Sequence, residues 1–291
     1  MPLRLGLVGH GRWGRNLERT LLSFPGVAVT VIAKGESAPP GLDGVLIATQ
    51  SATHAETALP YIEAGISTFI EKPMATAVFD ARRIEAAARR SGALVFVGHI
   101  FLYHPAFLAA LELLPDMGDV RYLSCEGMNA QPRTDSSVLW DWLPHDLSMA
   151  LAILKREPES VTAWSLSGGD TPTAAVSKFQ FGDIPVVCTT SWESPYPRRR
   201  TIIACQTATL IFDDKSERRL TLYDRYGSIT YPTFSDELPL TLEMKEFLNA
   251  ARSGKADTAH IQTGMAVVRA IAAAEESIRL NGQVVNIPTL K

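Results

Sequence analysis

The sequence has little of what marks several specialised classes of protein. Its 291 residues include only three cysteines, with no Cys-x-x-Cys pair and no His-Glu-x-x-His motif, which argues against a disulfide framework and against a metal site. The net charge is −3, so no electrostatic footprint for nucleic acid or for a membrane surface is present. No apolar run is long enough to span a bilayer, and the first strand pattern begins at Leu3, which leaves no room for a signal peptide. We therefore expect a cytoplasmic protein with no metal.

The three thiols and the densest basic run exclude few further classes of protein. Cys125, Cys188 and Cys205 each lie in an apolar, strand-like run, which predicts buried free thiols and fits a reducing compartment. The basic run Arg198–Arg200 has two interpretations, a solvated strand start or a site for an anionic group of a substrate. The first is the commoner case for such runs, and we expect it here.

The most informative stretch is the first fifteen residues. A short apolar run leads directly into Gly9-x-Gly11-x-x-Gly14, and Leu17 and Leu21 repeat Trp13 at helical spacing. In a strand–turn–helix unit the three glycines permit the turn, the approach of a pyrophosphate and close helix packing, in that order. The helix start then faces the phosphates. The candidate cofactor-binding residues of this loop are Gly9, His10, Gly11, Arg12, Trp13 and Gly14.

Strand and helix patterns alternate over the rest of the first 120 residues. Strands are predicted at Val27–Ala33, Val45–Ala48, Thr68–Glu71 and Leu94–Val97, and helices at Ala55–Ala64, Ala77–Arg90 and Pro105–Leu114. This rhythm predicts a doubly wound, mostly parallel α/β domain over residues 1–118. Ligands of such sheets bind at the carboxyl ends of the strands, where His10, Thr49, Lys72 and His99 should lie.

The pattern changes after Gly118 to strand after strand. Strands are predicted at 120–127, 161–166, 174–181, 185–191, 201–204, 209–212 and 220–223, with helices at Pro144–Leu154, Glu243–Ser253 and Gly264–Leu280. This predicts an α+β domain over residues 119–291 with a large, open, mostly antiparallel sheet. The apolar alternation in 186–191 and 202–212 indicates that the open face is covered by a partner.

Several segments together resemble a known family. They are Ile47–Glu56, Glu71-Lys72-Pro73, Val97-Gly98-His99, Tyr103–Ala106 and Val138–Asp146, the last of which holds Asp141 and His145. The chain is similar to the Gfo/Idh/MocA oxidoreductases, the relatives of glucose-fructose oxidoreductase and inositol 2-dehydrogenase. The resemblance implies a Rossmann domain, an open-faced sheet domain and homodimers or homotetramers formed through that sheet. It also implies hydride transfer between a nicotinamide and a carbinol carbon of a sugar or cyclitol, and often a cis peptide before Pro73.

The family's lysine and its Asp/His pair map to Lys72, Asp141 and His145, which we predict to be catalytic. Oxidation of an alcohol needs a base, and neutral histidine suits that role. Pro144 is a favourable first helical residue, so we expect His145 in a first turn, where the helix dipole disfavours imidazolium. The Asp141 carboxylate has the opposite effect, because its negative charge favours the imidazolium form. It can also accept a hydrogen bond from one ring nitrogen of His145. The Lys72 ammonium can stabilise a developing alkoxide.

The choice of cofactor depends on the end of the second strand. NAD sites usually carry an acid there for the ribose hydroxyls, but the chain continues Ala33-Lys34-Gly35 before Glu36. Lys34 and Arg12 could instead pair with a 2′-phosphate, so NADP is favoured over NAD. Thr49, His54, Glu71 and Lys72 complete the predicted cofactor contacts, with His54 near the nicotinamide end.

These features predict an NAD(P)-dependent dehydrogenase or reductase acting on a sugar, a nucleotide sugar or a cyclitol. A non-catalytic NAD(P)-binding sensor or regulatory protein of the same fold is the alternative, and a methyltransferase using the glycine loop is a third. His99 and His104 are expected to be structural or to line the substrate site, and His260 to lie on the surface. Asn129, Arg133, Trp192 and Tyr196 are weaker candidates for substrate contacts.

Overall fold

The computed structural model describes residues 2–33, 35–133, 136–169, 171–254 and 258–288. Lys34, on which the predicted NADP preference partly rests, lies outside the described residues. Packing divides the chain into two compact units, Met1–Ile100 with Glu237–Val268, and Phe101–Asp236 with Arg269–Lys291. Each unit is therefore discontinuous in sequence, whereas the predicted domains 1–118 and 119–291 are continuous, and that division stays a prediction.

The first unit is built on a parallel sheet of five strands in the order β2-β1-β3-β4-β5. The strands are β1 (Leu3–Val8), β2 (Val27–Ile32), β3 (Gly44–Ile47), β4 (Ser67–Glu71) and β5 (Val95–Gly98). The helices are α1 (Arg12–Leu22), α2 (His54–Glu63), α3 (Val78–Ser91) and α6 (Pro239–Ser253), with the start of α7 (Ala259–Arg279). The predicted doubly wound, mostly parallel domain is confirmed.

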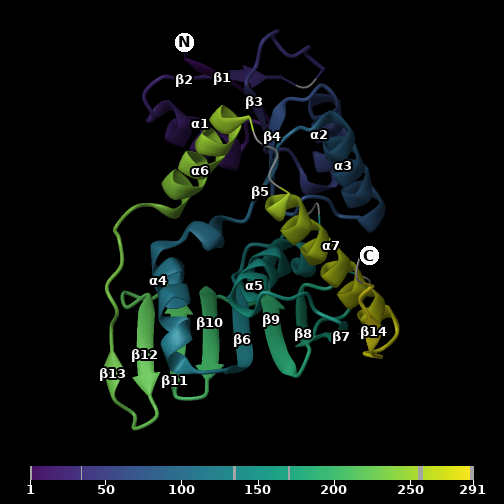
Figure 1. Cartoon of the computed structure of the whole chain (residues 1–291). Helices are drawn as coiled ribbons and strands as arrows, with labels where there is room; N and C mark the ends of the chain where they lie inside the picture. The colour runs from purple at the N-terminus through teal and green to yellow at the C-terminus, as the bar shows by residue number, and fades with distance from the viewer. Residues whose placement is uncertain (1, 34, 134–135, 170, 255–257, 289–291) are drawn as a thin grey trace. The chain divides into compact units, whose positions relative to one another are not determined.

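Helices pair on the two sides of this sheet, α1 with α6 and α2 with α3 (Figure 1). Strand β3, inside the sheet, and strand β5, at its edge, are buried at every position, so both faces of the parallel sheet are covered there. The rings of Phe69 and Phe96 stack 5.5 Å apart, and Phe247 of α6 packs edge-on against both, at 5.6 and 5.8 Å. The core of this unit thus depends on a helix from the far end of the chain.

The second unit is built on a sheet of nine strands in the order β13-β12-β11-β10-β6-β9-β8-β7-β14. Its strands are β6 (Val120–Met128), β7 (Ser160–Ser165), β8 (Ala174–Phe181), β9 (Ile184–Ser191), β10 (Arg198–Cys205), β11 (Ala208–Asp213), β12 (Leu220–Asp224), β13 (Ile229–Thr230) and β14 (Val285–Asn286). Neighbouring strands are antiparallel except β6 and β9, which are parallel. The predicted open, mostly antiparallel sheet is confirmed.

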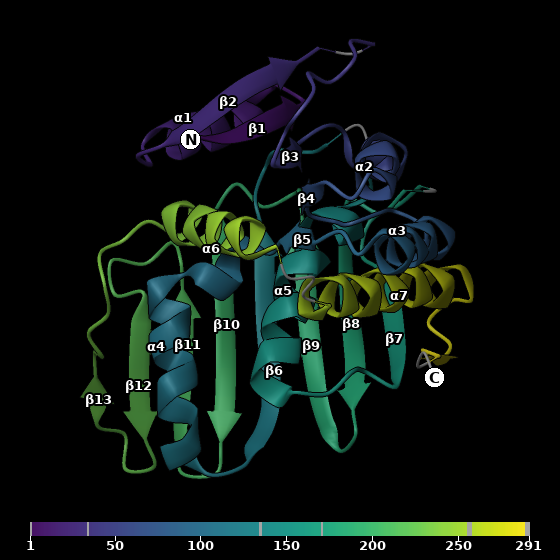
Figure 2. The same cartoon turned by 45° about the horizontal axis from the view of Figure 1, so that its top comes forward.

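One face of the large sheet carries α4 (Pro105–Leu113) and α5 (Val138–Leu154), as Figure 2 shows. Along β9 every second residue is buried beneath that cover, and the residues between are half-exposed. Val187, Ile202 and Ile211 belong to the half-exposed set, and the register places Ile202 opposite Ile211. The predicted apolar alternation is thus present on the face away from α4 and α5.

Three helices begin at least four residues earlier than predicted. The helix predicted from Pro144 begins at Val138, that from Glu243 begins at Pro239, and that from Gly264 begins at Ala259. In α5 the proline lies inside the helix, because the preceding apolar turn is buried against the sheet and forms despite the missing N–H group. The prediction that Pro144 starts this helix is therefore wrong.

The remaining expectations for the chain concern thiols and membranes. Cys125 and Cys188 are buried free thiols, as predicted, whereas Cys205 is only half-buried. Among the described helices, none combines the length and hydropathy of a membrane span.

Candidate active site

The glycine turn after β1 has the geometry that a dinucleotide phosphate requires. Gly9 has φ = 97°, and a Cβ there would collide with the carbonyl oxygen of Ala48. A Cβ on Gly14 would collide with the carbonyl oxygen of Gly9, so α1 can approach the strand only without one. A Cβ on Gly11 would meet nothing within 4 Å, and Gly11 is the N-cap residue of α1. The open side of the turn thus lies at the helix start, where backbone N–H groups point outward.

Side chains of the loop fix its shape. His10 Nε2 lies 2.7 Å from Glu18 Oε2, within the same strand–turn–helix unit. The indole N–H of Trp13 donates to Oε1 of Glu71, which lies at the end of β4. Trp13 is 37% exposed, so it does not continue the buried stripe of Leu17 and Leu21 as the spacing suggested. It ties the glycine loop to the strand that precedes Lys72.

The carboxyl ends of β3 and β4 carry the other predicted cofactor residues. Oγ1 of Thr49 accepts a hydrogen bond from Thr53 at 3.0 Å. His54 is 2% exposed, and its ring nitrogens lie 2.8 Å from the carbonyl oxygen of Pro73 and 3.2 Å from that of Thr49. His54 thus bridges two strand-end loops. The peptide between Lys72 and Pro73 is cis.

Lys72 and His99 lie at neighbouring positions on this edge, because Glu71 pairs with Gly98 in the sheet register. His99 is buried, and neither ring nitrogen has a hydrogen-bond partner among the described residues. Burial, with the nearby His260 and Lys72, lowers the pKa of His99 to about 3, so the ring stays neutral. His260 is half-buried and stacks on Phe96 at 3.8 Å, so its prediction as a surface residue is wrong.

Asp141 and His145 occupy successive turns of α5 in the second unit. Since α5 begins at Val138, His145 lies well inside the helix. The expectation that the dipole of a helix start disfavours its protonated form is therefore wrong. Oδ2 of Asp141 accepts the indole N–H of Trp192 at 3.0 Å, and Oδ1 lies 3.5 Å from Arg133 Nη1. Lys72 belongs to the first unit and the Asp/His pair to the second.

Aromatic rings enclose His145. Phe101 packs edge-on against the imidazole at 4.8 Å, and Trp142 does so at 6.3 Å. The indole of Trp142 also occupies the space above Gly127 of β6, where a Cβ would come within 2.7 Å of the ring. A glycine on the sheet therefore lets α5 lie close enough to hold these rings in place.

The basic run at the start of β10 splits between the two faces of the sheet. Arg198 and Arg200 pair with Glu126, whereas the Arg199 guanidinium lies 5.3 Å from the ring of Phe101 and 5.0 Å from that of Trp142. Successive residues of a strand point to opposite faces of the sheet, and this alternation produces the split. The same alternation could have been used to predict that Arg199 lies on the opposite face from its two neighbours. The run is thus not a uniform solvated strand start. Burial lowers the pKa of Arg199, and Asp214, Asp141 and Asp146 oppose that effect.

Two acids near Arg199 were not singled out from the sequence. Asp214 Oδ2 lies 3.5 Å from Arg199 Nη1, and Asp214 Oδ1 lies 3.4 Å from His104 Nε2. The structure thus gives His104 a structural contact. Asp146, next to His145, is 4% exposed, and burial raises its pKa to about 7, partly offset by Arg199. The residues beside Asp146 in the sequence do not indicate that its carboxyl group is buried.

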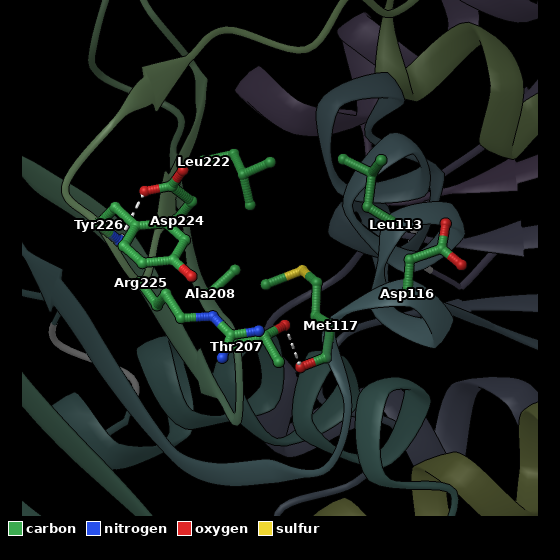
Figure 3. A pocket seen from close by; sticks show the side chains of 9 residues that line it. All are labelled: Leu113, Asp116, Met117, Thr207, Ala208, Leu222, Asp224, Arg225 and Tyr226. Carbon is green, nitrogen blue, oxygen red and sulfur yellow. Dashed lines mark hydrogen bonds between the residues drawn. The ribbon is translucent and has the colours of Figure 1, made fainter.

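Clusters of possible metal ligands and surface hollows do not add to the candidate site. Within the described residues, no group of three or more histidine, cysteine or acidic side chains could hold a metal ion. A surface hollow of about 290 Å³ in the second unit lies between Leu113 and Met117 on one side and Leu222 and Tyr226 on the other (Figure 3). None of the predicted site residues lines it.

The chain is similar in sequence to known oxidoreductases. Residues 27–99 match the oxidoreductase family with an NAD-binding Rossmann fold, GFO_IDH_MocA, and residues 117–211 match the GFO/IDH/MocA C-terminal domain. Inositol 2-dehydrogenase 3 of Saccharopolyspora erythraea is 35% identical over 144 residues, which cover 41% of this chain and 42% of that protein. UDP-N-acetylglucosamine 3-dehydrogenase of Acidithiobacillus ferrooxidans is 32% identical over 124 residues, which cover 42% of this chain and 39% of that protein. Each alignment thus spans less than half of the curated relative.

Solved structures resemble the chain over nearly its whole length. The structure of the Acidithiobacillus ferrooxidans enzyme gives a TM-score of 0.85 at 23% identity, covering 96% of this chain and 99% of that one. An inositol dehydrogenase homologue from Azotobacter vinelandii, complexed with NADH and myo-inositol, gives 0.82 at 15% identity, with 98% of each chain covered. These likenesses show the fold. Because the N-terminal and C-terminal domain models of one family together match more than half of the chain, it belongs to the Gfo/Idh/MocA oxidoreductases.

Proposed function

We propose that the protein is an NAD(P)-dependent oxidoreductase that transfers a hydride between the nicotinamide and a carbinol or keto carbon of a sugar, nucleotide sugar or cyclitol. The observation that carries the proposal is the glycine turn, closed by backbone at Gly9 and Gly14 and open at Gly11. The turn fits a pyrophosphate, since a side chain at Gly11 would fill the space that the phosphates need. Family membership and the names of the relatives support the substrate class.

The proposed catalytic residues are Lys72, Asp141 and His145. When bound, the nicotinamide supplies the hydride chemistry. His145 takes the hydroxyl proton as the carbon–hydrogen bond breaks, and returns it in the reverse direction. Asp141, held by the indole of Trp192, orients His145 and balances its charge. The Lys72 ammonium stabilises the developing alkoxide oxygen.

The test is turnover across a panel of polyols, cyclitols and nucleotide sugars with each nicotinamide cofactor. Lys72→Met and His145→Asn should each lower kcat at least about 100-fold, the usual effect of a lost acid–base or electrostatic group. Lys245→Met is the matched control, because Lys245 is an exposed lysine on α6. Unchanged turnover in both catalytic variants would refute the roles. Dinucleotide binding without turnover of any substrate would favour the non-catalytic sensor.

We keep NADP over NAD as the proposed cofactor preference, on the basis of Lys34 and Arg12. One contact supports the opposite choice, since the carboxylate of Glu36 accepts the backbone N–H of Ala33 at 3.1 Å and so lies at the end of β2. Titration with NADPH and NADH, followed by nicotinamide fluorescence, tests the preference. Lys34→Ala should weaken binding of NADPH and leave that of NADH unchanged, and equal losses for both would refute the proposal.

We also propose that the protein forms homodimers or homotetramers through the half-exposed face of the nine-stranded sheet. The apolar residues Val187, Ile202 and Ile211 on that face support the proposal. Light scattering should give more than one chain per particle, and Ile202→Lys should lower that mass by placing a charge in the interface. Val284→Lys, at an exposed position outside the sheet, is the control. A monomeric wild-type protein at micromolar concentration would refute the proposal.

A further inference from the structure

Arg199 of β10 has no role in the proposed reaction, although it packs on the rings that enclose the proposed base. Its guanidinium lies 5.3 Å from the ring of Phe101 and 5.0 Å from that of Trp142. The same two rings pack edge-on against the imidazole of His145, at 4.8 and 6.3 Å. All four residues belong to the second unit. The two rings therefore contact both a permanent cation and the proposed base.

Asp214, which follows β11, holds the arginine in this position. Its backbone N–H donates to the carbonyl oxygen of Arg199 at 3.0 Å, and its Oδ2 lies 3.5 Å from Arg199 Nη1. Lys215 Nζ lies 3.2 Å from the same Oδ2. Nδ1 of His104 accepts the backbone N–H of Ala106 at 3.1 Å, so the neutral ring carries its proton on Nε2, which faces Asp214 Oδ1 at 3.4 Å. Burial alone would raise the pKa of Asp214, but these three neighbours lower it, so the carboxylate stays ionised and fixes the guanidinium.

Two acids of α5 give the charge of Arg199 a function. Asp141 lies one turn before His145 and Asp146 directly follows it, and a carboxylate at either position favours the imidazolium form. A histidine that already holds the proton cannot act as a base. The charge of Arg199 interacts with both acids, and it limits the rise in the pKa of Asp146 that burial causes. A cation at this place thus opposes the tendency of the two acids to protonate His145.

We propose that Arg199 is a positioning residue for His145, whose guanidinium holds the rings of Phe101 and Trp142 against the imidazole and whose charge keeps the imidazole neutral. The inference rests on the proposed function and deepens it, because it adds a residue of the large sheet to the machinery of proton transfer. Arginine suits this role, since it combines a permanent charge with a flat face that stacks on rings. Arg199 acts through His145 and exchanges no proton with the substrate itself.

Other charged and titratable groups surround His145 within the second unit. They are Asp141 and Asp146 on α5, Arg133 before that helix, Cys125 and Cys188 on β6 and β9 of the covered sheet, His104 at the start of α4, and Asp214 with Lys215 after β11. Arg133 lies 3.5 Å from Asp141, and Lys215 is paired with Asp214. In the part of this unit that the structure describes, Arg199 is thus the cation that packs on the rings around His145.

The first experiment follows the His145 imidazole by NMR in the full-length protein before cofactor or substrate is added. Its resonance is assigned by its loss in His145→Asn. Arg199→Met, which keeps an apolar stem and removes the charge, should raise the midpoint of the His145 titration by about one pH unit. That is the size expected for two charges roughly 10 Å apart at the effective dielectric constant of a protein. Arg199→Lys keeps the charge and should leave the midpoint unchanged.

The second experiment measures kcat and KM against pH with a substrate that the wild type turns over. The acid limb of kcat should move to higher pH in Arg199→Met, in step with the NMR midpoint, while KM changes little. In Arg199→Lys the limb should stay in place and kcat should fall at every pH, because an ammonium group lacks the flat face that holds both rings. Arg198→Met is the matched control and should follow the wild type, since Arg198 is exposed and pairs with Glu126 on the other face of the sheet.

Equal midpoints in the wild type and in Arg199→Met would overturn the inference even if the variant were less stable, because a purely structural role leaves the protonation of His145 unaltered. An effect confined to KM would also overturn it, since the guanidinium would then bind the substrate. Should Arg199→Met fail to fold, Arg199→Gln, which is uncharged and keeps an N–H donor for Asp214, takes its place. Turnover by the wild type with equal midpoints removes the inference alone, whereas a wild type that turns over no substrate removes the proposed function and the inference together.

Discussion

Replacing Asp146 by asparagine should stabilise the folded protein above neutral pH and change its stability little near pH 4. Asp146 is 4% exposed, and its Oδ2 has no hydrogen-bond partner among the described residues. Burial raises its pKa from 3.8 to about 7, although Arg199 partly opposes this. Asparagine has nearly the same shape and resembles the protonated acid, so the variant keeps the packing and removes the ionisation.

The sign and size of the effect follow from proton linkage. Between pH 3.8 and about 7 the folded protein retains a proton that the unfolded chain has released, so the free energy of unfolding falls as pH rises. Above that window the penalty is constant at about 4 kcal/mol, because one pKa unit corresponds to about 1.4 kcal/mol. Between pH 5 and pH 8 the wild type should lose about 2.5 kcal/mol relative to the variant.

Urea unfolding of both proteins at pH 5 and pH 8 measures this difference, since subtraction cancels the other groups that titrate in the same range. Asp116→Asn, at an exposed aspartate, provides the matched control and should shift stability equally at both pH values. An Asp146→Asn effect that is the same at pH 5 and pH 8 would refute the account, and would mean that Asp146 is solvated or fully paired in the folded protein.

Three further substitutions have clear expected outcomes. Gly14→Ala should abolish dinucleotide binding in a fluorescence titration, because the new Cβ would collide with the carbonyl oxygen of Gly9; wild-type affinity would contradict this. Phe247→Ala should lower the free energy of unfolding by about 3–5 kcal/mol in urea, the usual result of removing a buried ring, and a loss under about 1 kcal/mol would show that the core collapses to fill the space. Trp192→Phe should lower kcat about 10-fold with KM little changed, because Asp141 loses a 3.0 Å hydrogen bond; a change confined to KM would place the indole on the substrate instead.

The sequence was most predictive where a local pattern determines the structure. The period of two in residues 186–191 correctly predicted a strand with one covered face, and the alternation of strands and helices predicted the parallel sheet. The glycine turn was predictable in detail, because Gly9 and Gly14 are required by backbone contacts within a few residues or across one strand pair.

Predictions failed where distant packing overrides a local rule. Pro144 favours a helix start, but the buried turn before it extends α5 to Val138. His260 gave no sign of burial, since its cover is the ring of Phe96, far away in the sequence. Strand alternation separates Arg199 from the arginines on either side of it, but only the tertiary contact with Trp142 of α5 shows that Arg199 lies on the covered face of the sheet. Such features depend on tertiary contacts that no window of sequence contains.

Residues 237–268 pack in the first unit although most of the second unit precedes them in the sequence. This order has a consequence for synthesis of the chain. When the ribosome has released residues 1–100, all five strands of the parallel sheet exist, but the helix that covers Phe69 and Phe96 does not. These aromatic side chains then remain uncovered by Phe247 while β6 to β13, eight of the nine strands of the second sheet, are translated. The N-terminal unit is therefore the first to begin and among the last to finish, and a chain terminated at Asp236 would leave it without part of its core.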